Sequence, residues 1–197
     1  MSQPNLPTPH KSKLEALLAN QRLPDSDKPK VQEASEMYQS WINEMEAVEQ
    51  GGANSVSELV AATNRYKRFI ELDLIFDSQN DFLYRQKGQL KLDNTILEEF
   101  LPQLIYRAIS SIDSTFQLGP RKTFSGLSFL SSIGLPGSGG TPSIRTKDQD
   151  FIVGKSLYLK SSFKDDFSDS TVIESNLGYV CAECKTNLDK TMFQEAV

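Results

Sequence analysis

Hydrophobic positions recur at the three- and four-residue spacing of an α-helix through the first half of the chain. The segment 31–50 is rich in Glu, Ala and Met, and it contains neither proline nor glycine. It is followed by Gly51 and Gly52, which is typical of a helix end. The pattern therefore predicts a helix over 31–50, and we expect its apolar side chains to pack in a core: Tyr38, Trp41, Ile42 and Met45.

Two further helices are expected from capping patterns. Ser55 and Glu58 have the spacing of a capping box, in which each side chain bonds the backbone N–H of the other residue. This pattern predicts a helix over 55–76. Thr95 and Glu98 repeat the spacing and predict the start of a third helix.

In the last third of the chain the hydrophobic period changes from the helical value to two, the period of a strand. Strands are expected over 151–159 and 178–186, with a short strand near 171–173 in the polar connection between them. The Gly- and Ser-rich segment 131–143 is expected to be a flexible loop, and 187–196 begins as a helix. The fold class is therefore α/β, with helices packed on a mixed sheet whose central hairpin is made by the two longer strands.

These elements divide the chain into three expected parts. Residues 1–30 contain five prolines around one short helical stretch at 11–21, which predicts a flexible N-terminal arm. A helical region follows over 31–112, and the strand-forming core occupies 113–197.

Composition excludes several chemistries. The single histidine, His10, lies in the Pro-rich arm, so a Ser-His-Asp triad or a two-histidine metal site has no candidate residues. Cys181 and Cys184 have the CxxC spacing, but on a strand they face opposite sides, so we expect two half-buried residues and no redox pair. No apolar run reaches the length of a membrane span and no secretory leader is visible, so we expect a cytoplasmic protein that does not contact a membrane.

The net charge of the 197 residues is −5, but the charges are unevenly placed. Residues 107–164 carry eight Lys and Arg against three acids. A basic block in an acidic protein can localise the binding of a polyanion. Four of these bases flank the Gly-rich loop and are candidate DNA contacts, although they could also be ordinary solvated charges: Arg121, Lys122, Arg145 and Lys147.

Three residues near the expected hairpin suggest a chemistry. Glu183 and Lys185 are two residues apart on an expected strand and so share a face. Asp150 directly precedes the other strand, so both acids meet at one end of the sheet if the strands are neighbours. Two carboxylates suit Mg²⁺, and a nearby lysine can orient a water molecule or stabilise charge on phosphorus. Asp148 is the alternative to Asp150, and the helical carboxylates Glu98 and Glu99 are further candidates.

The order Asp150, Glu183, Lys185 resembles the Asp…(Asp/Glu)-x-Lys signature of the restriction-endonuclease-like nucleases, the PD-(D/E)xK superfamily. The longer segments 146–163 and 179–196 resemble type II restriction endonucleases of the Bpu10I family, as does 119–145, which precedes the first acid. The resemblance covers roughly residues 60–196.

The resemblance implies a magnesium-dependent enzyme that cuts double-stranded DNA at a short specific site as part of a restriction-modification system. By the motif, Asp150 and Glu183 would be the metal ligands and Lys185 the catalytic lysine. A second nuclease subunit, identical or different, is an expected partner. Members of the family continue beyond the position of Val197, so we expect a truncated nuclease core; the alternative function is an inactive fragment that only binds DNA or associates with another subunit.

Overall fold

The computed structural model describes residues 6–48, 54–76, 91–109 and 112–185. The chain divides into two compact units, one comprising Met1–Ile112 with Cys184–Val197 and the other Asp113–Glu183. The first is helical and the second is a sheet, which confirms the α/β class with a helical N-terminal region. The helix expected over 187–196 lies outside the described residues.

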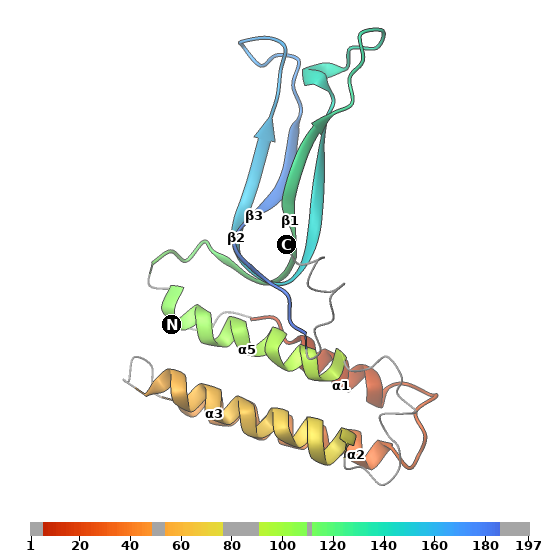
Figure 1. Cartoon of the computed structure of the whole chain (residues 1–197), viewed down its shortest axis with the longest axis vertical. Coiled ribbons are helices and arrows are strands. Elements are labelled where there is room, and N and C mark those ends of the chain that lie inside the picture. Colours follow the sequence, from red (N-terminus) through yellow and green to blue (C-terminus); the bar gives the residue numbers. More distant parts are fainter. Residues whose placement is uncertain (1–5, 49–53, 77–90, 110–111, 186–197) are drawn as a thin grey trace. The chain divides into compact units, whose positions relative to one another are not determined.

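The helical unit contains α1 (Pro9–Leu18), α2 (Lys28–Ala47), α3 (Ser55–Arg68) and α5 (Lys91–Ile109), and α3 continues directly into the π-helical segment η1 (Phe69–Phe76) (Figure 1). Their buried side chains form one apolar core, and the helical periodicity identified its centre correctly. Of the residues expected there, Tyr38, Trp41 and Met45 are buried and Ile42 packs against the core partly buried. None of the described helices has the length and apolar character that crossing a membrane requires.

The structure differs from the expected flexible arm. Residues 9–18 form α1, whose Leu14 and Leu17 belong to the core. The prolines misled the prediction because Pro9 and Pro29 occupy the first turns of α1 and α2, where a missing N–H costs nothing. Two of the five prolines in residues 1–30 therefore mark helix starts.

Neither capping box forms. The N-cap of α3 is Asn54, so Ser55 lies inside the helix, and Asn54 makes no side-chain capping bond. Helix α5 begins at Lys91, so Thr95 lies inside it, where its hydroxyl donates to the Leu92 carbonyl oxygen at 2.7 Å. A Thr or Ser that bonds back to the preceding turn is compatible with a helix interior, and the spacing to Glu98 is then incidental.

His10 lies at the centre of the helical core and is fully buried. Its Nδ1 lies 3.0 Å from the Leu92 carbonyl oxygen and 2.8 Å from the Thr95 hydroxyl. Its Nε2 lies 2.7 Å from the Tyr66 hydroxyl, so both ring nitrogens have hydrogen-bond partners. Burial lowers the pKa of His10 to about 3, so the ring is neutral at ordinary pH. Its expected place in a flexible tail was wrong.

Glu99 of α5 is also fully buried. Its carboxylate accepts the backbone N–H of His10 at 2.9 Å and that of Lys11 at 3.2 Å, and the Tyr38 hydroxyl donates to it at 2.5 Å. The N-cap residue of α1, Thr8, makes no side-chain capping bond. Glu99 therefore caps α1 from another helix, with its charge at the positive end of the helix dipole.

The second unit is a three-stranded antiparallel sheet in the order β1-β2-β3. Its strands are β1 (Gln117–Phe129), β2 (Pro142–Lys160) and β3 (Val172–Ala182). The expected central hairpin is present as β2 and β3, and the short strand near residue 172 is the start of β3. Strand β1 was not predicted, because its Gly, Pro and Ser residues obscure the alternation.

Strand β2 bends back on itself. Lys122 lies opposite Asp148, and Asn176 opposite Ser156, so the two positions are eight residues apart on β2, about 26 Å in a straight strand. The Asn176 amide nevertheless donates to the Lys122 carbonyl oxygen at 2.9 Å. The bend brings β1 over β3 and places both hairpin loops at the same end of the sheet (Figure 1).

Candidate functional site

The β2–β3 register determines where the two candidate acids lie. Ile152 is opposite Cys181 and Phe151 is opposite Ala182, the last pair of the ladder. The next residue before Phe151 is Asp150, and the next after Ala182 is Glu183. Directly opposite residues in an antiparallel ladder have Cα atoms about 4.5–5.5 Å apart and share a face. Asp150 and Glu183 are thus each one residue beyond the last pair of the β2–β3 ladder, which places their backbones near each other.

Two details of the expected arrangement are wrong. Asp150 does not precede a strand, because β2 begins at Pro142 and contains it. Strand β3 ends at Ala182, so Glu183 and Lys185 follow the strand and its two-residue alternation does not place them on one face. The boundary between the two units also falls after Glu183, which leaves the two acids in the sheet unit.

Both acids are half-buried, whereas the alternative acid Asp148 is exposed. Asp148 lies 3.9 Å from the Lys122 ammonium group, and both side chains are largely in solvent. An exposed pair of this kind contributes little to stability. The half-buried position of Asp150, next in register to a second acid, favours it over Asp148 as a ligand.

The donor chemistry of this acid pair fits Mg²⁺. Among the described residues, no group of three or more His, Cys, Asp and Glu side chains gathers as a metal cage would. Mg²⁺ is commonly held by one or two carboxylates together with water and phosphate oxygens, so a pair suffices. Asp150 and Glu183 supply hard oxygen donors of this kind.

The candidate DNA-contacting residues gather on the β1–β2 hairpin. In its register Lys122 is opposite Asp148, Lys147 is opposite Thr123, and Arg145 is opposite Gly126. Arg121 precedes Lys122 on β1, and by alternation it shares a face with Lys147 and Arg145. Three of the four side chains are exposed and Lys147 is half-buried. Four of the eight bases of the basic block therefore lie on one hairpin, and three of them, Arg121, Arg145 and Lys147, share a face.

The candidate Glu99 and one base of the 107–164 block, Lys155, have structural roles. Lys155 forms an ion pair with Asp113 and lies 4.8 Å above the Phe116 ring, and this pairing holds the pKa of Asp113 well below its usual range. Glu99 caps α1 within the helical core and so has a partner there. Lys155 and Glu99 are thus accounted for by local packing.

Among the described residues, Cys181 and Cys184 form no disulfide. Cys181 lies on β3 and is exposed, whereas Cys184 follows the strand and is buried. The expectation that both are half-buried was therefore wrong.

Residues 89–197, more than half of the chain, match a family model of restriction endonucleases. The matched region contains α5 and all three strands, with the acid pair and the basic hairpin. It defines a nuclease domain of the restriction endonuclease class. The model is that of the Bpu10I restriction endonuclease, and the chain belongs to this family. A comparison with curated proteins gives no match.

Proposed function

We propose that this protein is a type II restriction endonuclease of the PD-(D/E)xK superfamily, which hydrolyses phosphodiester bonds of double-stranded DNA at a short specific site. The supporting observation is the β2–β3 register, in which Asp150 and Glu183 are the next residues beyond the last pair. The family match supplies the class of reaction. We expect the protein to act in the cytoplasm, with a second nuclease subunit as partner.

In this proposal Asp150 and Glu183 hold Mg²⁺, and Lys185 is the catalytic lysine. The bound ion would supply Lewis-acid polarisation of the phosphate and lower the pKa of water. The two carboxylates fix the position of the scissile phosphate. The Lys185 ammonium group stabilises the negative charge that develops on the phosphate oxygens as water oxygen bonds to phosphorus and the ester oxygen leaves.

The basic hairpin holds the DNA in this proposal. Arg121, Lys122, Arg145 and Lys147 would contact backbone phosphates, and a bidentate arginine could read a guanine edge. Phosphate contacts fix the position of the duplex, and the acid pair then acts on one phosphodiester.

Plasmid cleavage with and without Mg²⁺ tests the proposal. We expect discrete fragments from the protein with Mg²⁺, and at least a hundredfold less cleavage from Asp150→Asn, Glu183→Gln and Lys185→Ala, because each removes a charge that acts in the transition state. Asp148→Asn is the matched control, and it should cleave like the unmodified protein.

DNA binding in Ca²⁺ separates the remaining possibilities. Variants that bind DNA but do not cut it support the assigned roles. Binding without cleavage by the unmodified protein would instead favour the alternative, a DNA-binding module. Equal loss of cleavage in Asp148→Asn and Asp150→Asn would contradict the choice of Asp150.

A further inference from the structure

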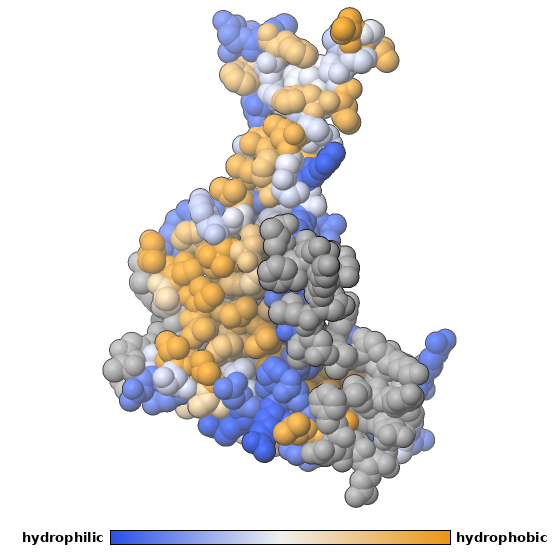
Figure 2. All heavy atoms as spheres, viewed as in Figure 1, coloured by the Kyte–Doolittle hydropathy of each residue, from blue (hydrophilic) through white to orange (hydrophobic). Residues whose placement is uncertain are grey.

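The loop that joins β1 to β2 carries the most exposed apolar side chains of the sheet unit. We call residues 130–141 the tip loop. Ile133 is fully exposed, Leu135 is 81% exposed and Leu130 is 69% exposed. The tip loop contains no charged residue. Figure 2 shows these apolar residues gathered at the end of the sheet, in the upper part of the view. Contiguous exposed apolar groups on a folded protein commonly mark a contact surface.

The exposed side chains of the tip loop lie on a turn that backbone hydrogen bonds hold in place. Backbone bonds join Leu130 to Thr141 at 3.1 Å and Ser131 to Gly140 at 3.2 Å, and Ser132 and Leu135 form an isolated bridge. Gly140 has a φ of +81°, which favours glycine. The tip loop therefore holds Ile133 and Leu135 outward without a further ordering cost on binding.

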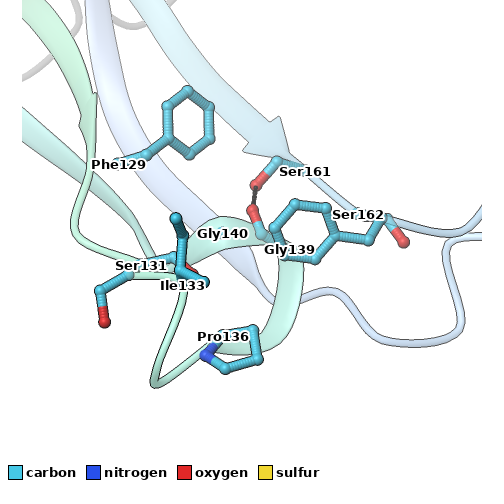
Figure 3. Close-up of a pocket in the computed structure, with 10 residues that line it drawn as sticks. Phe129, Ser131, Ile133, Pro136, Gly139, Gly140, Ser161 and Ser162 are labelled. Atoms are coloured by element: carbon cyan, nitrogen blue, oxygen red, sulfur yellow. Dashed lines mark hydrogen bonds between the residues drawn. The ribbon is translucent and has the colours of Figure 1, made fainter.

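The tip loop is braced by the second hairpin loop, residues 161–171. The Ser161 hydroxyl donates to the Gly139 carbonyl oxygen at 2.7 Å (Figure 3). Between the loops lies an open pocket of about 600 Å³ with Phe129, Ile133, Pro136 and Phe163 on its walls. A Cβ atom at Gly140 would lie 3.0 Å from the Phe129 ring and 3.5 Å from the Phe163 ring. The two loops are therefore joined at Ser161 and Gly139, and Gly140 leaves room for the Phe129 and Phe163 rings beside an open apolar pocket.

The β1–β2 hairpin with its tip loop is positively charged, whereas the 161–171 loop is negatively charged. Strands β1 and β2 with the tip loop, residues 117–160, carry six Lys and Arg against two acids. The 161–171 loop carries one lysine and three aspartates. A polyanion is therefore attracted to the β1–β2 side and repelled from the other loop.

We propose that the tip loop inserts Ile133 and Leu135 between base pairs of the double-stranded DNA held by the basic hairpin. Proteins that unstack and kink a duplex use aliphatic side chains and proline as wedges, flanked by cations that hold the phosphates. Here a hydrogen-bonded, uncharged turn contains Ile133, Leu135 and Pro136. The hairpin that ends in this turn carries the four Lys and Arg side chains that are the candidate DNA contacts. The inference rests on the proposed function, since it names how the same protein contacts the same DNA.

The experiment compares binding of two duplexes in Ca²⁺ by fluorescence anisotropy. One is a fully paired 24-base-pair duplex, and the other has the same sequence with a central two-nucleotide bulge, in which the unstacking cost is already met. Unstacking a step costs a few kcal/mol, so we expect the protein to bind the bulged duplex roughly tenfold more tightly. The double variant Ile133→Ser/Leu135→Ser should lose this preference.

Val172→Ser is the matched control, because Val172 is an exposed valine at the start of β3, beside the other loop. It should keep the preference for the bulged duplex. Both substituted tip side chains are exposed, so folding is expected to be retained, and circular dichroism checks it. The salt dependence of binding should be unchanged in the double variant, since no phosphate contact is removed.

Two results would overturn the inference while the proposed function stands. One is equal binding of both duplexes by the protein and the double variant. The other is loss of self-association in the double variant, measured by sedimentation, with DNA binding intact; the tip would then be a protein interface. Failure of the unmodified protein to bind any duplex would overturn the inference and the proposed function together.

Discussion

At the scale of single residues, the core of the helical unit is organised around two polar side chains. The His10 ring is held through both nitrogens, and Glu99 accepts three hydrogen bonds from α1 and Tyr38. Burial raises the pKa of Glu99 and lowers that of His10. Polar groups so enclosed must be paired, so each fixes the position of its partners as well as its own.

The first residue-scale prediction concerns the pH dependence of His10. Because its pKa falls from 6.5 to about 3 on folding, the unfolded chain takes up a proton between these values and the folded chain does not. The stability from this residue is complete above pH 6.5 and decreases as pH falls, by up to about 1.4 kcal/mol per unit. Since the chain has one histidine, its NMR ring signals report it alone, and they should stay constant between pH 5 and 8.

A control separates the pH dependence of stability that is due to His10 from that due to Asp93. Burial raises the pKa of Asp93 to about 6, so its contribution changes with pH in the opposite direction between 3.8 and 6. Asp93 is present in both the unmodified protein and His10→Gln, so its contribution cancels in the difference between their free energies of unfolding. A His10 titration near pH 6.5 in the folded protein would contradict its burial.

The sequence could predict only part of this core. Tyr38, Trp41 and Met45 repeat at helical spacing within one segment, so periodicity found them. His10 and Glu99 are 89 positions apart, and nothing local links them. The acid pair was predicted from an expected hairpin and a family resemblance, and its role stays a prediction. The ends of β2 and β3 depend on strand pairing and on the bend of β2, which alternation does not encode.

At the scale of elements, α1 depends on α5 for its N-terminal cap. Three donors converge on Glu99, so Glu99→Ala leaves them without an acceptor inside the core. We expect it to lower the free energy of unfolding by about 2–4 kcal/mol, measured by urea denaturation. Tyr38→Phe removes one of the three bonds and should cost about 1 kcal/mol.

Comparing Glu99→Gln with Glu99→Ala tells whether Glu99 caps α1 or only fills space. If Glu99 only fills space, Glu99→Gln should behave like the unmodified protein and Glu99→Ala should cost no more than a small cavity. A substantial loss in Glu99→Gln, whose amide nitrogen cannot accept, supports the capping role.

At the scale of the whole molecule, charge placement matters more than net charge. The chain carries −5 overall, but residues 117–160, which form β1, β2 and the tip loop, carry six Lys and Arg against two acids. The family match begins just before α5, so α1, α2 and α3 lie outside the matched residues, and α1 and α3 pack on α5 within the helical unit. The matched domain thus includes both the helix that organises one core and the strands of the other unit.

The basic side chains of the β1–β2 hairpin lead to a prediction about the salt dependence of DNA binding. Arg121→Ala and Lys147→Ala should each reduce the slope of log affinity against log salt by about one, because each removes a phosphate contact. Arg68→Ala makes the same change in net charge on α3 and should leave the slope unchanged. Equal effects at all three positions would show that net charge, and not the hairpin, governs binding.

Strand β2 contains both the cation Arg145 and the acid Asp150, five residues apart on one continuous strand. Five residues span about 16 Å of straight strand, and the odd separation places the two side chains on opposite faces of β2. In the proposed nuclease, the bend and twist of β2 therefore decide whether the cation that binds a phosphate and the acid that acts on one reach the same duplex. Adding one residue between them would bring Arg145 and Asp150 onto one face of the strand.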